Sequence, residues 1–369
     1  MKGKRFLCIM LVIWAFLGLV NLLARLCTPL TDFYIAHIFP LISGLWSRVS
    51  GLVPFSVGEW MIVCGVVLVM VGIIGLPLVL LFGKSRRRRI LTIAGQCYGW
   101  VVTWVLCLMT FRFFVLYQGT QLSRTIDRTT YANADVLRVY RTLAEQADAE
   151  GERVARDADG HFVLTDDLVP EAKACMMRLA NNYPQFQGFY PDPKPIYHAY
   201  FFSQQNLIGI YFPHSMEANY NPVVYDVNLP VTICHEYTHL KGNIFEDEAG
   251  YYAFLACQTS ESADFRYSAY ISALEWFDVD FGDDADAWEE FQEIYQSMSE
   301  GVRTDLYSYV PDDYWETHRE TEEVIPTVIV TETAEKVMDA SLKVNGVPEG
   351  VGSYAGMTLL LLDDYLNQT

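Results

Sequence analysis

The chain has 369 residues and a formal net charge of −19, with 51% hydrophobic and 19% charged residues. The charge is divided unevenly. Residues 1–118 hold 11 Lys and Arg against two acids, a balance of +9, whereas residues 119–369 hold 15 Lys and Arg against 43 acids, a balance of −28. An acidic surface of this strength repels nucleic acid, so nucleic-acid binding is excluded. The split predicts a membrane domain at 1–118 followed by a soluble domain at 119–369.

Three uncharged apolar stretches occupy the first part, at 6–24, 60–82 and 90–111. Each is long enough to cross a bilayer core of about 30 Å at about 1.5 Å per helical residue, so three transmembrane helices are expected. The first stretch could also be a signal peptide, because Lys2, Lys4 and Arg5 precede it, but its length and the lack of a clean cleavage site favour an anchor.

The cations of the first part predict its orientation. Five lie in the short loop at 83–89 and three in the first five residues, whereas segment 28–56 has only Arg48. The positive-inside rule then places the N-terminus and the 83–89 loop in the cytoplasm. Segment 28–56 is expected outside as amphipathic interfacial helices, and everything after Arg112 is expected outside as an extracytoplasmic domain of a multi-pass cell-membrane protein.

The second part alternates helical and strand patterns. Apolar spacing predicts helices at 133–149, 170–182, 228–240, 246–260, 265–276, 287–302, 334–340 and 356–367. Aromatic and β-branched content predicts strands at 195–202 and 207–212, and 151–167 is expected to be irregular. The expected fold is a mostly helical α+β domain with a small sheet. Its three cysteines lack CxxC spacing, which argues against a cysteine zinc site.

The helix at 228–240 carries His235-Glu236-Tyr237-Thr238-His239. Histidines four residues apart lie on one helix face, where both can bind one ion, and Glu236 beside them can reach a metal-bound water. This HExxH arrangement is typical of zinc hydrolases, although two ordinary helix histidines would give the same letters.

A catalytic zinc needs a third protein ligand and an open position for water. Glu246 and Glu248 begin the next helix after a turn containing Gly242, so either could complete a His₂Glu site. Simple placement of acids at a helix N-terminus is the alternative explanation. The E-x-x-A run Glu246–Ala249 resembles the gluzincin class of peptidases, and that resemblance makes Glu246 the ligand. Gly250 departs from the class, where an Asp or Asn would orient a histidine.

A wider resemblance covers most of the chain. It is similar to a bacterial family of multi-pass HExxH proteins, the domain-of-unknown-function 3810 family. The matching runs are Pro54–Gly58, Gly209–Pro213, Glu217–Asn219, the HExxH helix, Glu246–Ala249, Phe265–Ser268, Leu342–Gly346 and Gly352–Tyr354. The resemblance implies a membrane-tethered, zincin-like metallopeptidase domain and supplies no substrate.

The expected activity is therefore zinc-dependent peptide hydrolysis in the cell envelope, with Zn²⁺ on His235, His239 and Glu246 and with Glu236 as the general base. Tyr354 is the expected oxyanion donor, and Tyr267, Arg266 and His214 are alternatives; core packing competes with this role for each tyrosine. The strand at 207–212 could pair with an extended peptide. A zinc-binding sensor or interaction protein of the envelope without turnover, and a metal-free structural protein of the envelope, remain open. Intramembrane proteolysis is disfavoured, because the motif lies far beyond the last apolar stretch.

Overall fold

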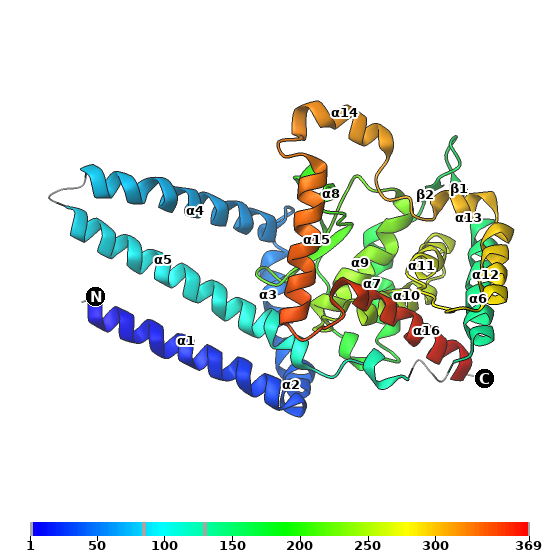
Figure 1. The fold of residues 1–369 in the computed structure, drawn as a ribbon, viewed down its shortest axis with the longest axis horizontal. Helices are drawn as coiled ribbons and strands as arrows, with labels where there is room; N and C mark the ends of the chain where they lie inside the picture. The colour runs from blue at the N-terminus through cyan, green and yellow to red at the C-terminus, as the bar shows by residue number, and fades with distance from the viewer. Residues whose placement is uncertain (1–2, 83–85, 128–130, 368–369) are drawn as a thin grey trace.

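The computed structural model describes residues 3–82, 86–127 and 131–367. Three long helices extend from one side of the molecule (Figure 1): α1 (Gly3–Leu26), α4 (Val57–Phe82) and α5 (Arg87–Met109). All three are long and apolar enough to cross a membrane, and most of their side chains are exposed. They coincide with the three apolar stretches expected from the sequence, except that residues 110–111 of the third belong to the next element, η2, so membrane association is plausible for this part of the chain.

Segment 28–56 folds into short helices, as expected. It contains α2 (Thr28–Phe33), the π-helix η1 (Tyr34–Ile38) and α3 (Phe39–Ser50). Helix α3 packs on the C-terminal part rather than standing apart from it: Phe39 is fully buried in the main core, and Ser43 Oγ donates to the Leu240 carbonyl at 2.6 Å.

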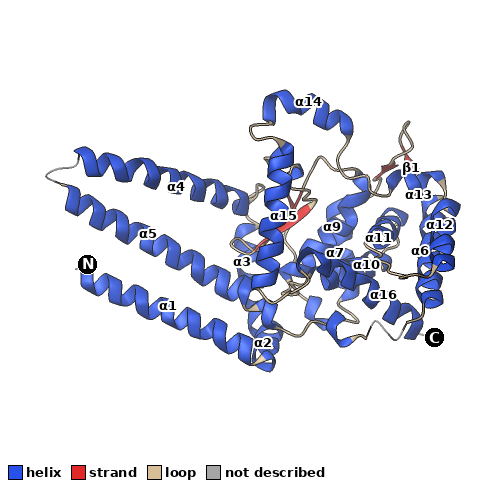
Figure 2. Cartoon of the chain, viewed as in Figure 1, coloured by secondary structure: helices blue, strands red, loops and turns tan. Residues whose placement is uncertain are grey.

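The chain continues from α5 through short turns into a helical body (Figure 2). The connecting turns are η2 (Thr110–Phe114), η3 (Leu116–Gln118) and η4 (Ser123–Thr125). The helices of the body are α6 (Asn133–Gly151), α7 (Leu168–Leu179), α8 (Ala199–Ser203), α9 (Leu229–Leu240), α10 (Glu246–Gln258), α11 (Ala263–Glu275), α12 (Ala285–Ser297), α13 (Glu300–Asp305), α14 (Asp312–Glu322), α15 (Thr327–Val344) and α16 (Gly356–Asn367), with the short turns η6 (Pro184–Phe186), η7 (Asp226–Asn228) and η8 (Gly350–Ala355).

The described strands form two small sheets. In the first, β1 (Ala155–Arg156) pairs antiparallel with β2 (Phe162–Val163). The second has the order β3-β5-β4, in which β3 (Lys194–Pro195) runs parallel to β5 (Glu217–Tyr220) and β4 (Gly209–Phe212) runs antiparallel to it. Strand β4 therefore lies at an edge. The predicted mostly helical fold with a small sheet is confirmed.

Two local expectations are wrong, and one strand was not predicted. The strand expected at 195–202 stops after Pro195, and 199–203 form helix α8. The helix expected at 287–302 is two helices, α12 and α13, because Met298 has extended backbone and Ser299 Oγ caps the second helix by accepting from Val302 N. Strand β5, with the polar sequence EANY, was not expected.

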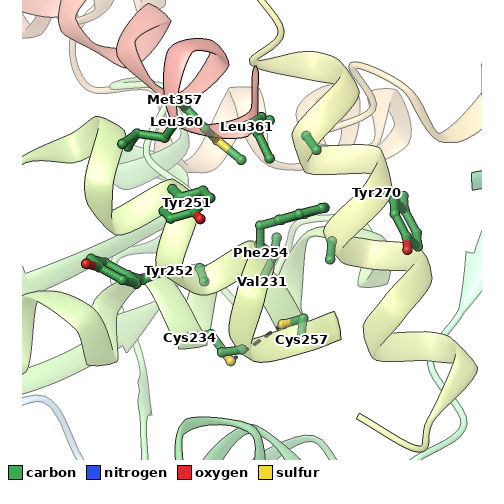
Figure 3. Close-up of a cluster of buried hydrophobic side chains, with 14 of the residues drawn as sticks. Val231, Cys234, Tyr251, Tyr252, Phe254, Cys257, Tyr270, Met357, Leu360 and Leu361 are labelled. Carbon is green, nitrogen blue, oxygen red and sulfur yellow. Dashed lines mark hydrogen bonds between the residues drawn. The ribbon is translucent and has the colours of Figure 1, made fainter. Parts of the chain in front are cut away.

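The main core lies between the helices of the C-terminal part, and Figure 3 shows part of it. Side chains from α9 (Val231, Cys234), α10 (Phe254, Cys257) and α16 (Leu361) meet there, all of them buried. Cys175, Cys234 and Cys257 are free and buried, as expected of packed thiols. The core also takes in Phe39, Leu116 and Tyr117 from before residue 118, so packing is continuous across the change in composition.

Two carboxylates join the long helices to the small sheet. Glu217 of β5 accepts from Gly58 N at 2.8 Å and Val57 N at 3.3 Å, and so caps α4, while also pairing with the buried Lys194. In the opposite direction, Glu59 of α4 accepts from the amides of Tyr197 and His198, at 2.9 and 2.8 Å, just before α8. These bonds join the first turn of α4 to β5 and to the segment just before α8.

Candidate metal centre

The candidate ligands lie on two consecutive helices. Helix α9 begins with Pro230 in its first turn and buries almost every side chain, including His239 and Glu236. It ends before Gly242, whose φ of +99° allows a sharp reversal and whose missing side chain leaves room for Phe39. The reversal brings the first turn of α10 back against α9.

Three ligand atoms converge at this reversal. Glu246 Oε2 lies 3.1 Å from His235 Nε2 and 3.4 Å from His239 Nε2. One donor atom from each of the three residues lies within 4.8 Å of the others, and the two imidazole planes stand 87° apart with centroids separated by 4.6 Å. Two imidazoles and a carboxylate form the donor set that Zn²⁺ takes in hydrolases, leaving a fourth position for water or substrate.

A backbone group orients one imidazole. His239 Nδ1 lies 2.8 Å from the Asn243 carbonyl, which fixes Nδ1 as the donor and turns Nε2 toward Glu246. The space beside Gly250 is filled by Met357, since a Cβ at position 250 would lie 3.0 Å from Met357 Sδ. The Asn243 carbonyl thus supplies an orienting contact for His239.

The charges within the cluster shift the pKa values of its members. Burial alone would raise the pKa of Glu246, but the charge of His239 and hydrogen bonds from both histidines lower it below its usual range. Burial lowers the pKa of His235, whereas the Glu246 charge raises that of His239 to about 9 against the effect of burial. The carboxylate is therefore held ionised beside a proton that a metal ion would displace.

Glu236 lies beside the cluster without a hydrogen-bond partner for its Oε2 among the described residues. Burial raises its pKa to about 8. The start of β4 covers it closely: a Cβ at Gly209 would lie 2.6 Å from Glu236 Oε1 and 2.5 Å from Thr232 Cγ2. A buried acid next to three candidate metal ligands, with one oxygen that has no partner among the described residues, has the properties expected of a general base that would take a proton from a bound water.

The neighbouring acids of α10 are engaged elsewhere. Glu248, the other possible third ligand, accepts from Leu122 N and from Asn243 Nδ2 at 2.7 Å. Asp247 accepts from Gln121 Nε2 at 2.9 Å and from Ser123 Oγ. Both carboxylates hold the turns that follow α5, so the geometry favours Glu246 as the third ligand.

Two of the expected oxyanion donors are committed to other contacts. Tyr267 is fully buried and donates to Asp305 Oδ2 at 2.6 Å. Arg266 donates to both oxygens of Glu150, at 3.0 and 2.9 Å. His214 lies in the β4–β5 turn, where its carbonyl accepts from Arg112. Tyr354 belongs to η8, and its side chain lies outside the described part of the structure.

Two aromatic residues near the cluster were missed by sequence reasoning. The Tyr211 ring of β4 lies 6.2 Å from the His239 ring. The Tyr117 ring packs on that of Phe245, the residue before Glu246, with centroids 5.8 Å apart, and burial raises the pKa of Tyr117 together with the Glu246 charge. Tyr117 follows the third apolar helix directly, and no pattern in the sequence pairs it with Glu246.

A cavity of about 350 Å³ lies on the far side of the first turn of α10. Asp247 contributes to its lining, together with Asp278, Asp280 and Phe281, but none of His235, Glu236, His239 and Glu246 does. The chemistry of the candidate centre therefore belongs to the α9–α10 reversal and not to this cavity.

These features define a mostly helical protein with three helices suited to a membrane and a His₂Glu cluster on a helix reversal. The family model described as "Protein of unknown function (DUF3810)" matches residues 34–362, and the chain belongs to that family. No curated protein and no solved structure matches the chain.

Proposed function

We propose that this protein is a membrane-anchored zinc metallopeptidase. The observation that carries the proposal is the convergence of His235 Nε2, His239 Nε2 and Glu246 Oε2 beside a buried oxygen of Glu236 that has no hydrogen-bond partner among the described residues. The three ligands fit Zn²⁺ in type and number, and their arrangement on two successive helices is zincin-like, of the gluzincin kind. When bound, zinc would supply Lewis-acid polarisation of a water and of a peptide carbonyl.

The chain's own residues supply the proton transfers. Glu236 accepts a proton from the attacking water and passes it to the amine that leaves. Its burial makes it a stronger base than an exposed carboxylate, since the raised pKa moves its proton affinity toward neutral pH. Asn243 holds His239 in one tautomer through its backbone carbonyl.

Strand β4 supports an extended peptide as the substrate class. It is an edge strand in the described sheet, and Gly209 at its start lies directly against Glu236. A peptide added along this edge would gain backbone hydrogen bonds and lie beside the general base. The absence of a side chain at Gly209 supports this placement.

The proposed location is the cell membrane, with the catalytic part outside the cytoplasm. The described cations Lys4, Arg5 and 86–89 lie at the end of the long helices remote from the body (Figure 1). The positive-inside rule assigns that end to the cytoplasm. Peptides or proteins of the cell envelope are then the accessible substrates.

A zinc-binding sensor without turnover is the second candidate. The observation that favours it is the enclosure of the site: Glu236 is only 5% exposed and β4 lies against it. A sensor would bind zinc in the same three ligands and would leave Glu236 without a chemical task.

Zinc content and hydrolysis separate these candidates. The full chain, purified in detergent, is expected to bind one zinc and to cleave fluorescein-labelled casein. Glu236→Gln should keep the zinc and lose at least about 100-fold in hydrolysis, because a general base contributes roughly 10²–10⁴. His239→Ala should lose the zinc.

His318→Ala is the matched control, since His318 contacts a carbonyl of its own helix and lies on α14, away from the cluster. It should keep both zinc and hydrolysis. Zinc binding in the wild type without cleavage of casein would establish the sensor, and a wild type without zinc would exclude both candidates.

A further inference from the structure

Helix α15 runs across the direction of α1, α4 and α5 at the junction between the long helices and the body (Figure 1). Its 18 residues give it a length of about 27 Å at about 1.5 Å per residue. Contacts at both ends hold it there. Arg25 in the last turn of α1 donates to the Val344 carbonyl at 2.9 Å, and Gln204 donates to the Ile325 carbonyl at 3.0 Å just before α15 begins.

The surface of α15 is divided into three faces. One packs on the body through Val330 and Leu342, which are buried. A second is charged and neutralises itself, with the pairs Lys336–Glu332 and Lys343–Asp339 at 3.1 and 2.7 Å. The third is an exposed stripe at successive spacings of four, four, three and four residues, which one helix face presents. It is apolar except for Thr333, and its members are Ile329, Thr333, Val337, Ala340 and Val344.

This stripe is left uncovered by the described part of the chain. Ile329, Val337 and Val344 are 56, 63 and 70% exposed. Apolar side chains repeated along one face of a helix, rather than scattered singly, mark a surface that meets another apolar phase.

Neighbouring groups show how deep α15 would lie in a bilayer. Trp60 in the first turn of α4 lies 6.4 Å from the exposed ring of Tyr197, and both are at the end of α4 that meets the body. Tryptophan and tyrosine gather at membrane–water interfaces, and arginine commonly lies at the end of a span as Arg25 does in α1. The two ends of α15 therefore touch segments that would lie at the level of the lipid headgroups.

We infer that α15 is an in-plane interfacial helix whose stripe of Ile329, Val337 and Val344 inserts among the lipids of the leaflet nearest the body. The inference rests on the membrane anchoring within the proposed function. The mixed charges of the polar face make the contact one of apolar burial rather than attraction to anionic headgroups. The occupant of the stripe is then the same bilayer that receives α1, α4 and α5.

Insertion of α15 into the bilayer would also limit movement of the candidate metal centre, through the elements that pack between them. Helix α15 packs on η8, which leads into α16, and Met357 of α16 lies against Gly250 of α10. Helix α10 carries Glu246. Lipid contact at α15 would thus be transmitted through η8 and α16 to α10, the helix that carries the proposed third ligand.

Photocrosslinking tests the contact in the full chain. p-Benzoylphenylalanine replaces Val337 on the stripe, Glu335 on the charged side or Val67 on α4, and the protein is reconstituted in vesicles of phosphatidylethanolamine and phosphatidylglycerol. Val67 is 55% exposed on α4 and serves as the control for lipid contact. Lipid adducts are counted by mass spectrometry of the labelled peptides.

Position 337 is expected to form lipid adducts at a yield similar to that of position 67 and roughly tenfold above that of position 335, since only one face of an interfacial helix enters the lipid. Adducts at 67 without adducts at 337, or crosslinks from 337 to protein, would overturn the inference while leaving the anchoring intact. No adducts at 67 would remove the anchoring, and the inference with it. Zinc binding is measured on the same samples and reports on the metal centre independently.

Discussion

Gly209 is where a single added carbon should have the largest effect on the candidate centre. A Cβ there would lie 2.5–2.6 Å from Thr232 Cγ2 and Glu236 Oε1, closer than packed atoms allow. Gly209→Ala should therefore push Glu236 or β4 aside and destabilise the chain by about 1–3 kcal/mol, as overpacking usually does. Zinc binding should persist, since none of the three ligands is touched, while hydrolysis falls.

Gly65→Ala is the control for this change. Gly65 has nothing within 4 Å of the added carbon, so the control reports the effect of alanine alone. Thermal unfolding, zinc content and hydrolysis of the two variants give the comparison. Equal behaviour of Gly209→Ala and Gly65→Ala would show that β4 does not press on Glu236.

Glu275 should make the stability of the protein depend on pH. Its carboxylate accepts from Tyr307 N at 2.6 Å, and burial raises its pKa from 4.5 to about 7 despite that bond. The folded state therefore binds a proton that the unfolded state releases between about pH 4.5 and 7, so stability falls as pH rises through this window. Glu275→Gln should flatten the dependence and raise the melting temperature at pH 8.

Melting temperatures at pH 5.5 and pH 8 measure the effect as a difference between variants. Glu289→Gln on the exposed side of α12 is the matched control and should leave the wild-type pH dependence in place. A Glu275→Gln variant that keeps the full wild-type slope would contradict the assignment to Glu275.

At the scale of residues, the sequence predicted those contacts that follow from helical spacing. Histidines four residues apart must share a face, and Gly242 allowed a reversal, so the approach of His235, His239 and a glutamate near 246 could be expected. The contact of Gly209 with Glu236 and the support of His239 by the Asn243 carbonyl could not. Both depend on how a strand and a turn pack on α9, and no local pattern records such contacts.

At the scale of elements, the buried ion pair between β3 and β5 is the contact that should be most sensitive to a single substitution. Lys194 and Glu217 are 4% and 1% exposed at their side chains, and Glu217 also caps α4. Glu217→Gln leaves a buried ammonium without its counter-charge, which typically costs about 3–5 kcal/mol. The melting temperature of the full chain should fall strongly, and protease sensitivity near β5 should rise.

Glu332→Gln on α15 provides the matched substitution at the surface. Its partner Lys336 is 76% exposed at the side chain, and such pairs contribute about 0–1 kcal/mol. The control should therefore unfold almost as the wild type does. Similar losses in the two variants would mean that the buried pair is not the stabilising contact described above.

The same region shows why element prediction failed where it did. Residues 195–202 have the aromatic content of a strand, but Glu59 from α4 binds the amides of Tyr197 and His198, the two residues before α8. A side chain rather than a neighbouring strand therefore takes up these amides. Strand β5 is polar in sequence and yet buried, because Glu217 binds Gly58 N and pairs with Lys194. In both cases the deciding contact comes from a residue far away in sequence, so tertiary structure overrides the local preference.

At the scale of the whole molecule, the change from a cationic to an acidic chain near residue 118 does not coincide with a gap in packing. Phe39 fills the space beside Gly242, Ser43 binds the last carbonyl of α9, and Leu116 and Tyr117 lie in the main core. These contacts support the helix reversal that carries the candidate ligands. Composition divides the chain into an apolar part and an acidic part, but it holds no information about which side chains cross that division.

The fragment 119–369 should therefore be much less stable than the full chain. Removal of Phe39, Leu116 and Tyr117 leaves cavities of aromatic and aliphatic size, and each such loss costs about 2–5 kcal/mol in a packed core. Hydrogen exchange of the α9 amides should quicken in the fragment, and its zinc content should fall below that of the full chain. A full chain nicked at an engineered protease site after Arg86 is the control, because the break lies at the end of α5 remote from the body and leaves every one of these contacts in place. A fragment with the exchange protection and zinc content of the nicked chain would show that the first 118 residues only anchor the domain, whereas the loss expected here would make them part of the metal centre's support.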